Sequence, residues 1–316
     1  MQIRGNYLAE KILDILANKK AQLKNKNLRL CAIYVGKDSE QLGYLKKKEE
    51  IAKRLGIEFK LKHITKKISF QKLAEIIHKI ANNPKTTGVI IQQPIPSELQ
   101  TNTIYDFIPR VKEIEGFSDK SPFFPPLGLA VLTILKYIYL AEIYNNPDEK
   151  INDLIVYPEI KERYLHKIYE NPESIKLDKY FFKDTFSDKK IVLLGRGLTG
   201  GGPIAKTLNE FGLNFINIHS GVPDPSIFTK EADIIISAVG KKKVLTADMV
   251  KDGCILINVG LHKTNGKIAG DFSKKEMEPK AKFFTSAVNG IGPLNIAYIY
   301  KNLIESALFQ EKGIEF

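Results

Sequence analysis

The chain has 316 residues, of which 43% are hydrophobic and 27% charged, values typical of a globular protein with room for two domains. Its net charge of +12 comes almost entirely from lysine, since only six of the 48 basic residues are arginine. Proteins that read phosphates and base edges depend on arginine, and here the lysines are interleaved with acids without a nucleic-acid-binding motif. We therefore expect no nucleic-acid partner; the lysines reflect a lysine-rich composition or attract a small polyanionic substrate.

The sequence also argues against a membrane segment and a disulfide framework. The longest apolar stretch, 127–140, is interrupted by Lys136 and is too short to span a bilayer, and no apolar secretory signal opens the chain. Cys31 and Cys254 each lie in an apolar strand-like run, without a second cysteine or a histidine at metal-ligand spacing. We expect a cytoplasmic protein with two core cysteines, no metal and no membrane contact.

The first third of the chain alternates helix and strand patterns. We predict a helix near 5–23, a strand at 28–35, a helix at 42–55, a strand near 57–63, a helix near 71–82 and a strand at 88–92. Such alternation predicts a parallel sheet covered by helices. Residues 117–127, rich in Phe and Pro, are the candidate domain boundary.

One lysine of the 42–55 helix is unusually placed. At about 100° per residue, one stripe of this helix carries Tyr44, Lys48, Ile51 and Leu55. A lysine among apolar neighbours loses hydration, and its pKa should fall toward a value useful for proton transfer. The alternative is that its stem lies along apolar surface while the ammonium group reaches water.

Residues 141–187 are rich in Tyr, Lys, Glu, Asn and Asp and lack a clean period. We interpret them as helical fragments and loop without a recognisable catalytic constellation.

A glycine-rich turn follows the strand expected at 191–194. It runs from Gly195 to Pro203 and leads into a helical stretch at 204–211. Glycines let backbone N–H groups approach a phosphate, and the helix N-terminus is electropositive, so the segment predicts a dinucleotide phosphate site. Strands expected at 214–219, 232–237 and 254–259 support this interpretation.

The residues after the second of these strands bear on the choice of cofactor. His219 and Ser220 stand where NAD-binding folds usually present a carboxylate to the ribose. With no acid there and Arg196 in the turn, a 2′-phosphate is accepted, so we expect NADP, with NAD as the alternative. The competing interpretation of Arg196 is a surface loop arginine.

Eight segments, in order, resemble motifs of the bifunctional methylenetetrahydrofolate dehydrogenase/cyclohydrolase family over nearly the whole chain. They are Val35-Gly36 with Tyr44-x-x-x-Lys48, then 88–96, 112–117, 195–203 with His219-Ser220, 232–240, 258–260, Gly270-Asp271 and 290–293. The resemblance implies an α/β protein of two domains with a cleft between them. Residues 1–122 form the catalytic, folate-binding domain, to which the C-terminal helix 291–316 returns. Residues 123–290 form the Rossmann NAD(P)-binding domain, with an insertion at about 141–187 that we expect on its rim, away from the glycine-rich turn.

The resemblance also implies the chemistry: oxidation of 5,10-methylenetetrahydrofolate with NADP, then hydrolysis of the 5,10-methenyl product to 10-formyltetrahydrofolate, in one-carbon metabolism by a homodimer. Lys48 then shuttles a proton, Tyr44 orients water or folate, and Gln92 holds the lysine. The implied substrate contacts are Glu115, Gln41, Gly290 and Pro293. The implied cofactor contacts are Gly195, Arg196, Gly197, Gly201, Ser220 and Gly240.

Several positions depart from the family pattern. Gln41 replaces a folate-contacting serine, Glu115 replaces the pterin-binding aspartate, and Gly197 replaces the serine after Gly-Arg. The closing segment 285–295 is altered as well. Three alternatives remain. The departures at Gly197 and 285–295 favour a relative that keeps one activity, the 141–187 insertion favours a non-catalytic nucleotide- or partner-binding protein, and the net charge favours a nucleic-acid binder. A buried Tyr44, Lys48 and Gln92 set argues against the non-enzymes, because a scaffold does not need a desolvated lysine.

Overall fold

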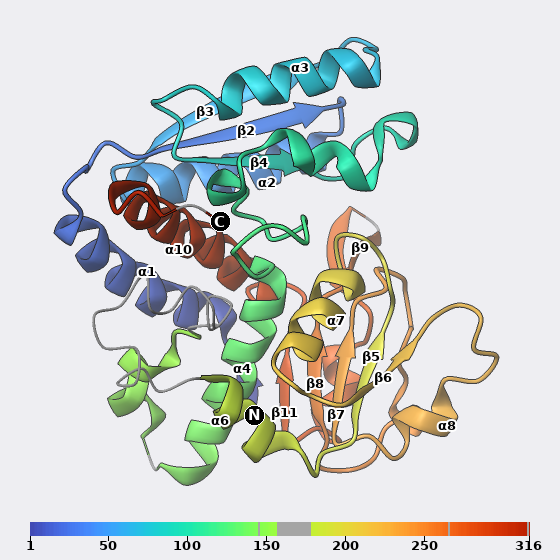
Figure 1. Cartoon of the computed structure of the whole chain (residues 1–316). Helices are drawn as coiled ribbons and strands as arrows, with labels where there is room; N and C mark the ends of the chain where they lie inside the picture. Colours follow the sequence, from blue (N-terminus) through green and yellow to red (C-terminus); the bar gives the residue numbers. More distant parts are fainter. Residues whose placement is uncertain (145, 157–177, 265, 315) are drawn as a thin grey trace. The chain divides into compact units, whose positions relative to one another are not determined.

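The computed structural model describes residues 1–144, 146–156, 178–264, 266–314 and 316 (Figure 1). By their contacts these residues divide into two compact units. Unit 1 comprises 1–12, 127–156 and 178–295, and unit 2 comprises 13–126 and 296–316. The sequence analysis placed 1–122 in one domain; here the first twelve residues group with unit 1, where β1 (Gln2–Ile3) pairs with β11 (Phe283–Thr285). The expected cleft stays a prediction.

Unit 2 is built on a three-stranded parallel sheet in the order β3-β2-β4. Its elements are β2 (Arg29–Val35), α2 (Ser39–Arg54), β3 (Glu58–Ile64), α3 (Phe70–Ala81) and β4 (Gly88–Gln92), with the second half of α1 (Gly5–Gln22) before them and most of α10 (Ile291–Glu311) near the end of the chain. Three short 3-10 helices follow β4, at Ser97–Leu99, Asn102–Phe107 and Arg110–Lys112. Figure 1 shows α3 on one face of the sheet and α2 with α10 on the other. The predicted alternation of helix and strand is confirmed.

Local signals set the ends of α2. The helix begins three residues before the predicted start because the Asp38 carboxylate accepts a hydrogen bond from the backbone N–H of Glu40 at 2.7 Å. Lys53 and Arg54 in the last turn complement the helix dipole. Gly56 follows at φ +62°, a left-handed conformation that favours glycine after a helix.

The core of unit 2 follows from strand alternation. Successive side chains of a strand point to opposite faces, and Cys31, Ile33 and Val35 of β2 pack in one cluster with Leu73 and Ile77 of α3. Cys31 is a free, buried cysteine, as is Cys254 of unit 1. The expectation that both are core residues is confirmed.

Unit 1 contains a six-stranded parallel sheet in the order β1-β11-β8-β7-β5-β6. The four strands not yet located are β5 (Ile191–Leu194), β6 (Phe215–Ile218), β7 (Ile234–Ser237) and β8 (Ile255–Asn258), and α7 (Gly201–Glu210) follows β5. The chain passes from β5 to β6 on one side and reaches β7 on the other. Open α/β sheets bind ligands at such a reversal, outside the carboxyl ends of the strands.

Several short elements of unit 1 were not predicted. They are β1 and β11, the antiparallel hairpin of β9 (Leu261–Thr264) and β10 (Lys267–Gly270), the helices α8 (Ser226–Thr229) and α9 (Lys274–Met277), and a 3-10 turn at Ala247–Met249. Each has four residues or fewer. Segments this short carry too little periodicity to be recognised.

The apolar stretch expected at 127–140 forms a longer helix, α4 (Pro126–Ile143). Its 18 residues are enough, by length and composition, to cross a membrane, so the expectation that the stretch is too short was wrong. Pro126 opens the helix, where its missing N–H has no cost. Inside the protein 61% of this apolar window is buried, as in the core helices of proteins that never enter a bilayer.

Of the predicted insertion at 141–187, residues 157–177 lie outside the described residues. Its described flanks are a 3-10 helix at Pro147–Leu154 and α6 (Asp178–Phe186). Lys136 of α4 forms an ion pair with Asp178, and the ring of Phe182 packs edge-on against Phe211, 5.5 Å between centroids. These flanks therefore pack within unit 1, while the place of the remainder stays a prediction.

Candidate functional site

Lys48 lies on the buried face of α2, with 7% of its surface exposed. Leu45 and Ala52 are the buried residues beside it, whereas Tyr44 and Ile51 are only half-buried. Two members of the predicted stripe, Lys48 and Leu55, are therefore buried as predicted, while the other two are replaced by neighbouring positions, since the face of α2 that meets the core is set by its packing. Lys48 itself is buried, as expected.

A chain of side-chain hydrogen bonds starts at Lys48. Its Nζ donates to Gln92 Oε1 at 2.8 Å, and Gln92 Nε2 donates to Gln41 Oε1 at 2.7 Å and to the carbonyl oxygen of Gln93 at 3.0 Å. Gln92 is the last residue of β4, so this chain lies at the carboxyl edge of the unit 2 sheet. Because the Gln92 N–H groups are engaged elsewhere, its oxygen faces the lysine. The predicted contact between Gln92 and Lys48 is confirmed.

Glu115 is the buried acid of this centre, with 8% of its surface exposed. Its Oε2 accepts a hydrogen bond from the backbone N–H of Ile91 at 2.8 Å. Burial raises the pKa of Glu115 to about 7, against the attraction of Lys48 and the bond from Ile91. Burial also lowers the pKa of Lys48, against the attraction of Glu115. Both shifts favour neutral forms, a condition that suits proton transfer near neutral pH.

Two residues that the sequence analysis did not single out support this centre. The Glu113 carboxylate, 1% exposed, accepts hydrogen bonds from the backbone N–H groups of Glu115 at 3.0 Å and Ser118 at 3.3 Å. The Tyr300 hydroxyl of α10 donates to the carbonyl oxygen of Lys48. The signal for Glu113 was its place in the 112–117 motif, whereas nothing in the sequence pointed to Tyr300.

Three further predicted catalytic or substrate-binding residues, Tyr44, Gly290 and Pro293, are not part of the hydrogen-bond chain that starts at Lys48. Burial raises the pKa of Tyr44, but no hydrogen bond between Tyr44 and Lys48 occurs in the described structure. Gly290 comes just before α10, where a Cβ would lie 2.1 Å from the carbonyl oxygen of Ser286, so the turn there requires glycine. Pro293 lies in the first turn of α10.

A second candidate site is a cavity of about 410 Å³ in unit 1 at the carboxyl ends of β5, β6 and β7. Four predicted cofactor residues line it, Gly195, Arg196, Gly197 and Ser220, together with His219. The other two predicted glycines adjoin it. Gly201 is the first residue of α7, and Gly240 at φ +75° stands between two lining residues.

The glycines of this turn fit a dinucleotide phosphate. Gly195 has φ +105°, and a Cβ on it would lie 2.6 Å from the carbonyl oxygen of Ala238. A Cβ on Gly197 would meet nothing within 4 Å, so the backbone there faces open space. Together with the N-terminus of α7, this leaves room for a phosphate beside N–H donors.

Cationic side chains line the same cavity. Arg196 and Lys241 are both exposed there, beside Ser220. Lys241 was not predicted, although the lysine run at 241–243 after Gly240 was a readable signal. The residues present therefore fit a nucleotide that carries a further phosphate.

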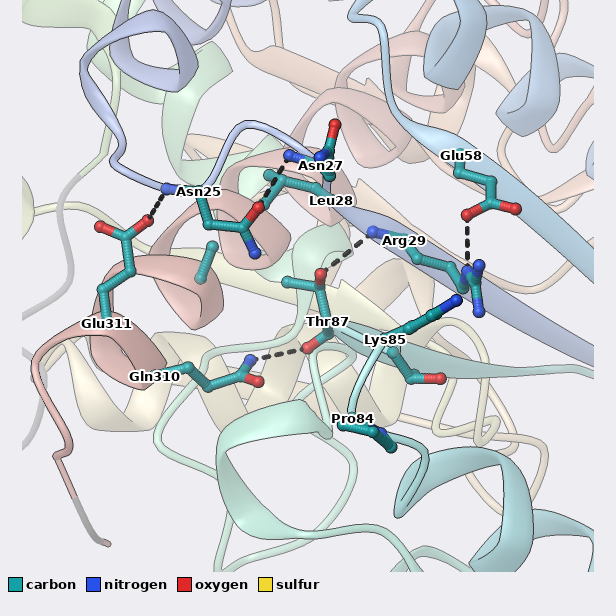
Figure 2. Close-up of a pocket in the computed structure, with 12 residues that line it drawn as sticks. Asn25, Asn27, Leu28, Arg29, Glu58, Pro84, Lys85, Thr87, Gln310 and Glu311 are labelled. Carbon is teal, nitrogen blue, oxygen red and sulfur yellow. Dashed lines mark hydrogen bonds and ion pairs between the residues drawn. The ribbon is translucent and has the colours of Figure 1, made fainter.

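Another cavity, of about 570 Å³, lies in unit 2 at the amino ends of β2, β3 and β4. Figure 2 shows several of its polar groups bonded to one another. Arg29 pairs with Glu58 at 2.6 Å, and Gln310 donates to the carbonyl oxygen of Thr87 at 3.0 Å. Since Lys48 lies at the opposite edge of the sheet, we assign this cavity no part in the chemistry.

Comparisons with known proteins match both units. The model of the tetrahydrofolate dehydrogenase/cyclohydrolase catalytic domain matches residues 3–115, and that of the NAD(P)-binding domain of the same family matches 177–311. The bifunctional protein FolD 2 of Lactobacillus johnsonii and FolD of Lactobacillus gasseri are each 30% identical over 304 residues, which cover 96% of this chain and 95% of each relative. The crystal structure of the bifunctional FolD methylenetetrahydrofolate dehydrogenase/cyclohydrolase of Campylobacter jejuni matches with a TM-score of 0.76 and 25% identity, over 97% of this chain and 98% of that one. The chain therefore belongs to the tetrahydrofolate dehydrogenase/cyclohydrolase family.

Proposed function

We propose that this protein oxidises 5,10-methylenetetrahydrofolate to 5,10-methenyltetrahydrofolate with NADP, and hydrolyses the methenyl compound to 10-formyltetrahydrofolate. The observation that carries the proposal is the buried Lys48, hydrogen-bonded to Gln92 and attracted by the buried acid Glu115. A glycine-lined cavity that fits a dinucleotide phosphate supports the oxidative step.

In the hydrolytic step, Lys48 is the proton carrier. Its neutral amine accepts a proton from the water that adds to the methenyl carbon. The bond from that carbon to N5 then breaks, N5 takes up one of the two protons of the water, and the formyl C=O forms as the hydroxyl proton is lost, so one proton leaves overall. The hydrogen bond to Gln92 Oε1 uses one N–H of the amine and helps aim its lone pair at the water.

The neighbouring side chains bind and orient the substrate. Glu115 accepts the paired N–H donors of the pterin amide edge, a geometry that suits a carboxyl group. The hydrogen bond from the backbone N–H of Ile91 fixes the position of the Glu115 carboxyl group, whose side chain is longer than that of the aspartate in the family pattern. Gln41, already bonded to Gln92, offers its amide to the folate, and Tyr44 orients the water. Gly290 and Pro293 complete the proposed substrate contacts.

For the oxidative step, NADP when bound would supply the hydride acceptor for the methylene carbon, and the chain's part is binding and alignment. Gly195, Gly197 and Gly201 let the backbone approach the pyrophosphate at the N-terminus of α7. Arg196 and Ser220 bind the 2′-phosphate, because no acid stands at 219–220 to repel it.

Absorbance at the NADPH and methenyl bands tests both steps. The protein is mixed with methylenetetrahydrofolate and each oxidised cofactor in turn, and separately with methenyltetrahydrofolate alone. We expect the protein to reduce NADP. In the assay without nucleotide, we expect it to hydrolyse the methenyl compound faster than buffer alone does. Failure to reduce either nucleotide would reject the dehydrogenase, and hydrolysis at the buffer rate would reject the cyclohydrolase.

The same measurement tests the alternative that the protein has only one of the two activities. That alternative is favoured by Gly197, which offers no hydroxyl to the cofactor, and by the altered 285–295 segment. A protein that hydrolyses the methenyl compound but reduces neither nucleotide would be this monofunctional relative.

We also propose a cytoplasmic homodimer, as the family resemblance implies. Sedimentation equilibrium tests the assembly: we expect twice the chain mass of 35.7 kDa. A single-chain mass at micromolar concentration would reject the dimer.

A further inference from the structure

Asp271, which follows β10 directly, is fully buried and accepts four hydrogen bonds through its carboxylate. The hydroxyl of Ser237 donates at 2.6 Å. Three successive backbone N–H groups also donate to it, from Val239 at 2.9 Å, Gly240 at 2.7 Å and Lys241 at 3.0 Å. A single carboxylate therefore binds three successive backbone N–H groups of the loop that follows β7.

The same residue holds the loop at its far end. The carbonyl oxygen of Asp271 accepts a hydrogen bond from the N–H of Val244 at 2.8 Å, and its own N–H donates to Asn258 Oδ1 at 2.8 Å. Val239, Lys241 and Val244 all line the 410 Å³ nucleotide cavity. The wall of that cavity on the β7 side is thus a loop wrapped around one carboxylate.

We propose that Asp271 is a positioning residue for the nucleotide. Its carboxylate holds loop 239–244 in the shape that admits the cofactor and keeps Lys241 at the cavity, although Asp271 is buried beneath the loop and is not among the residues that line the cavity. The inference rests on the proposed binding of NADP and deepens it. It also gives a role to a conspicuous motif, Gly270-Asp271, that the catalytic chemistry does not use.

An asparagine at this position keeps the shape but fails as an acceptor. If the new amide NH₂ takes the place of Oδ1, it faces the N–H groups of Gly240 and Lys241; if it takes the place of Oδ2, it faces that of Val239. In either orientation a backbone donor meets a donor and loses its partner. The loop must then move, and the cavity wall moves with it.

The experiment compares Asp271→Asn with Asp233→Asn by titration with NADP and with NAD. Asp233 precedes β7 and lies at the opposite end of that strand, where it accepts a hydrogen bond from the N–H of Lys190 at 2.7 Å and pairs with Lys251. For Asp271→Asn we expect the Kd of both nucleotides to rise at least about tenfold, in parallel, because both share this wall. For Asp233→Asn we expect no change. Hydrolysis of methenyltetrahydrofolate without nucleotide should be unaltered in both.

If Asp271 served only to keep the protein folded, its loss would not be confined to the KM for the nucleotide. Steady-state kinetics are therefore measured as well. For Asp271→Asn we expect a raised KM for NADP with kcat largely retained. A second variant, Gly240→Ala, disturbs the same loop from outside: its φ of +75° is strained for alanine, and the Cβ would lie 3.1 Å from the carbonyl oxygen of Leu261. It should raise both Kd values too, and it replaces Asp271→Asn if that variant does not fold.

A folded Asp271→Asn with unchanged nucleotide Kd would overturn the inference while leaving the proposed function intact. An equal rise in Asp233→Asn would also overturn it, because general loosening of unit 1 would then explain both. Should Asp271→Asn fail to fold, an unchanged Kd in Gly240→Ala would overturn the inference in its place. Failure of the unmodified protein to bind either nucleotide would instead reject the proposed function, and this inference with it.

Discussion

The Lys48 centre of unit 2 and the nucleotide cavity of unit 1 are built by different means. Lys48, Gln92 and Glu115 are each less than 9% exposed and act through side chains. In the cavity, Arg196 and Ser220 are exposed, and the shape comes from glycine backbone. Proton transfer needs desolvated groups with shifted pKa values, whereas a polyanion needs N–H groups within reach. Changes of side-chain chemistry should therefore break the first site, and changes of backbone conformation the second.

The largest effect is expected for Lys48→Met, which keeps the apolar stem and removes the proton carrier. Hydrolysis of methenyltetrahydrofolate should fall about 10²- to 10⁴-fold, the usual worth of a general acid or base, while nucleotide Kd stays unchanged. Initial rates corrected for the buffer reaction measure it. Lys46→Met, at an exposed position of the same helix, is the matched control and should keep full activity. Unchanged hydrolysis by Lys48→Met would remove Lys48 from the mechanism.

Gly195→Ala is the corresponding test of the second site. Alanine is strained at φ +105°, and its Cβ would lie 2.6 Å from the carbonyl oxygen of Ala238, so the turn must shift. We expect nucleotide Kd to rise roughly 100-fold, as for a misplacement of about 1 Å, with hydrolysis retained. Gly43→Ala, where a Cβ meets nothing within 4 Å, controls for the substitution itself. Nucleotide binding that survives Gly195→Ala would show that backbone shape does not govern this cavity.

Arg196→Ala sharpens the comparison, because here a side chain of the second site is tested. One charge-assisted contact is worth roughly tenfold in affinity, so we expect NADP to bind about tenfold more weakly and NAD to be unaffected. Titration of both nucleotides measures the preference before and after the change. Equal affinity for NAD and NADP in the unmodified protein would show that Arg196 does not read the 2′-phosphate.

The smallest effect is a shift in pH dependence on Glu115→Gln. Burial lowers the pKa of Lys48, and the negative charge of Glu115 opposes that shift. Removal of the charge therefore lowers the pKa of Lys48 further. Since neutral Lys48 accepts the proton, the acid limb of the hydrolysis profile should move to lower pH, whatever the rate at its plateau. A limb that stays in place or moves to higher pH would contradict the coupling of Glu115 and Lys48.

Much of both sites could be predicted from the residues. The position of Lys48 among apolar neighbours and the strand, glycine-rich turn and helix at Gly195 are local patterns with a direct physical meaning. Motif order then linked Gln92 to Lys48. The exact buried face of α2 could not be predicted, because the Asp38 cap and packing against α10 set it, so Leu45 and Ala52 took the places expected for Tyr44 and Ile51.

Contacts between residues far apart in the chain were the other feature that the sequence could not predict. β1 has two residues, and its partner strand begins at Phe283, so no pattern in the sequence announces the pairing. The same holds for Asp271, whose three backbone donors lie 30 to 32 positions earlier in the chain. The Gly270-Asp271 motif marked this acid, but nothing in the sequence showed that the fold would bury it beneath a distant loop.

The most direct test of the account follows both absorbance bands while methylenetetrahydrofolate and NADP react with the unmodified protein and with Lys48→Met in parallel. The unmodified protein should form NADPH while the methenyl compound stays low, because hydrolysis removes it. Lys48→Met should still form NADPH, but the methenyl compound should accumulate in step with it. A methenyl band that stays equally low in both proteins, or the absence of NADPH from both, would contradict the assignment of two chemistries to two separately built sites.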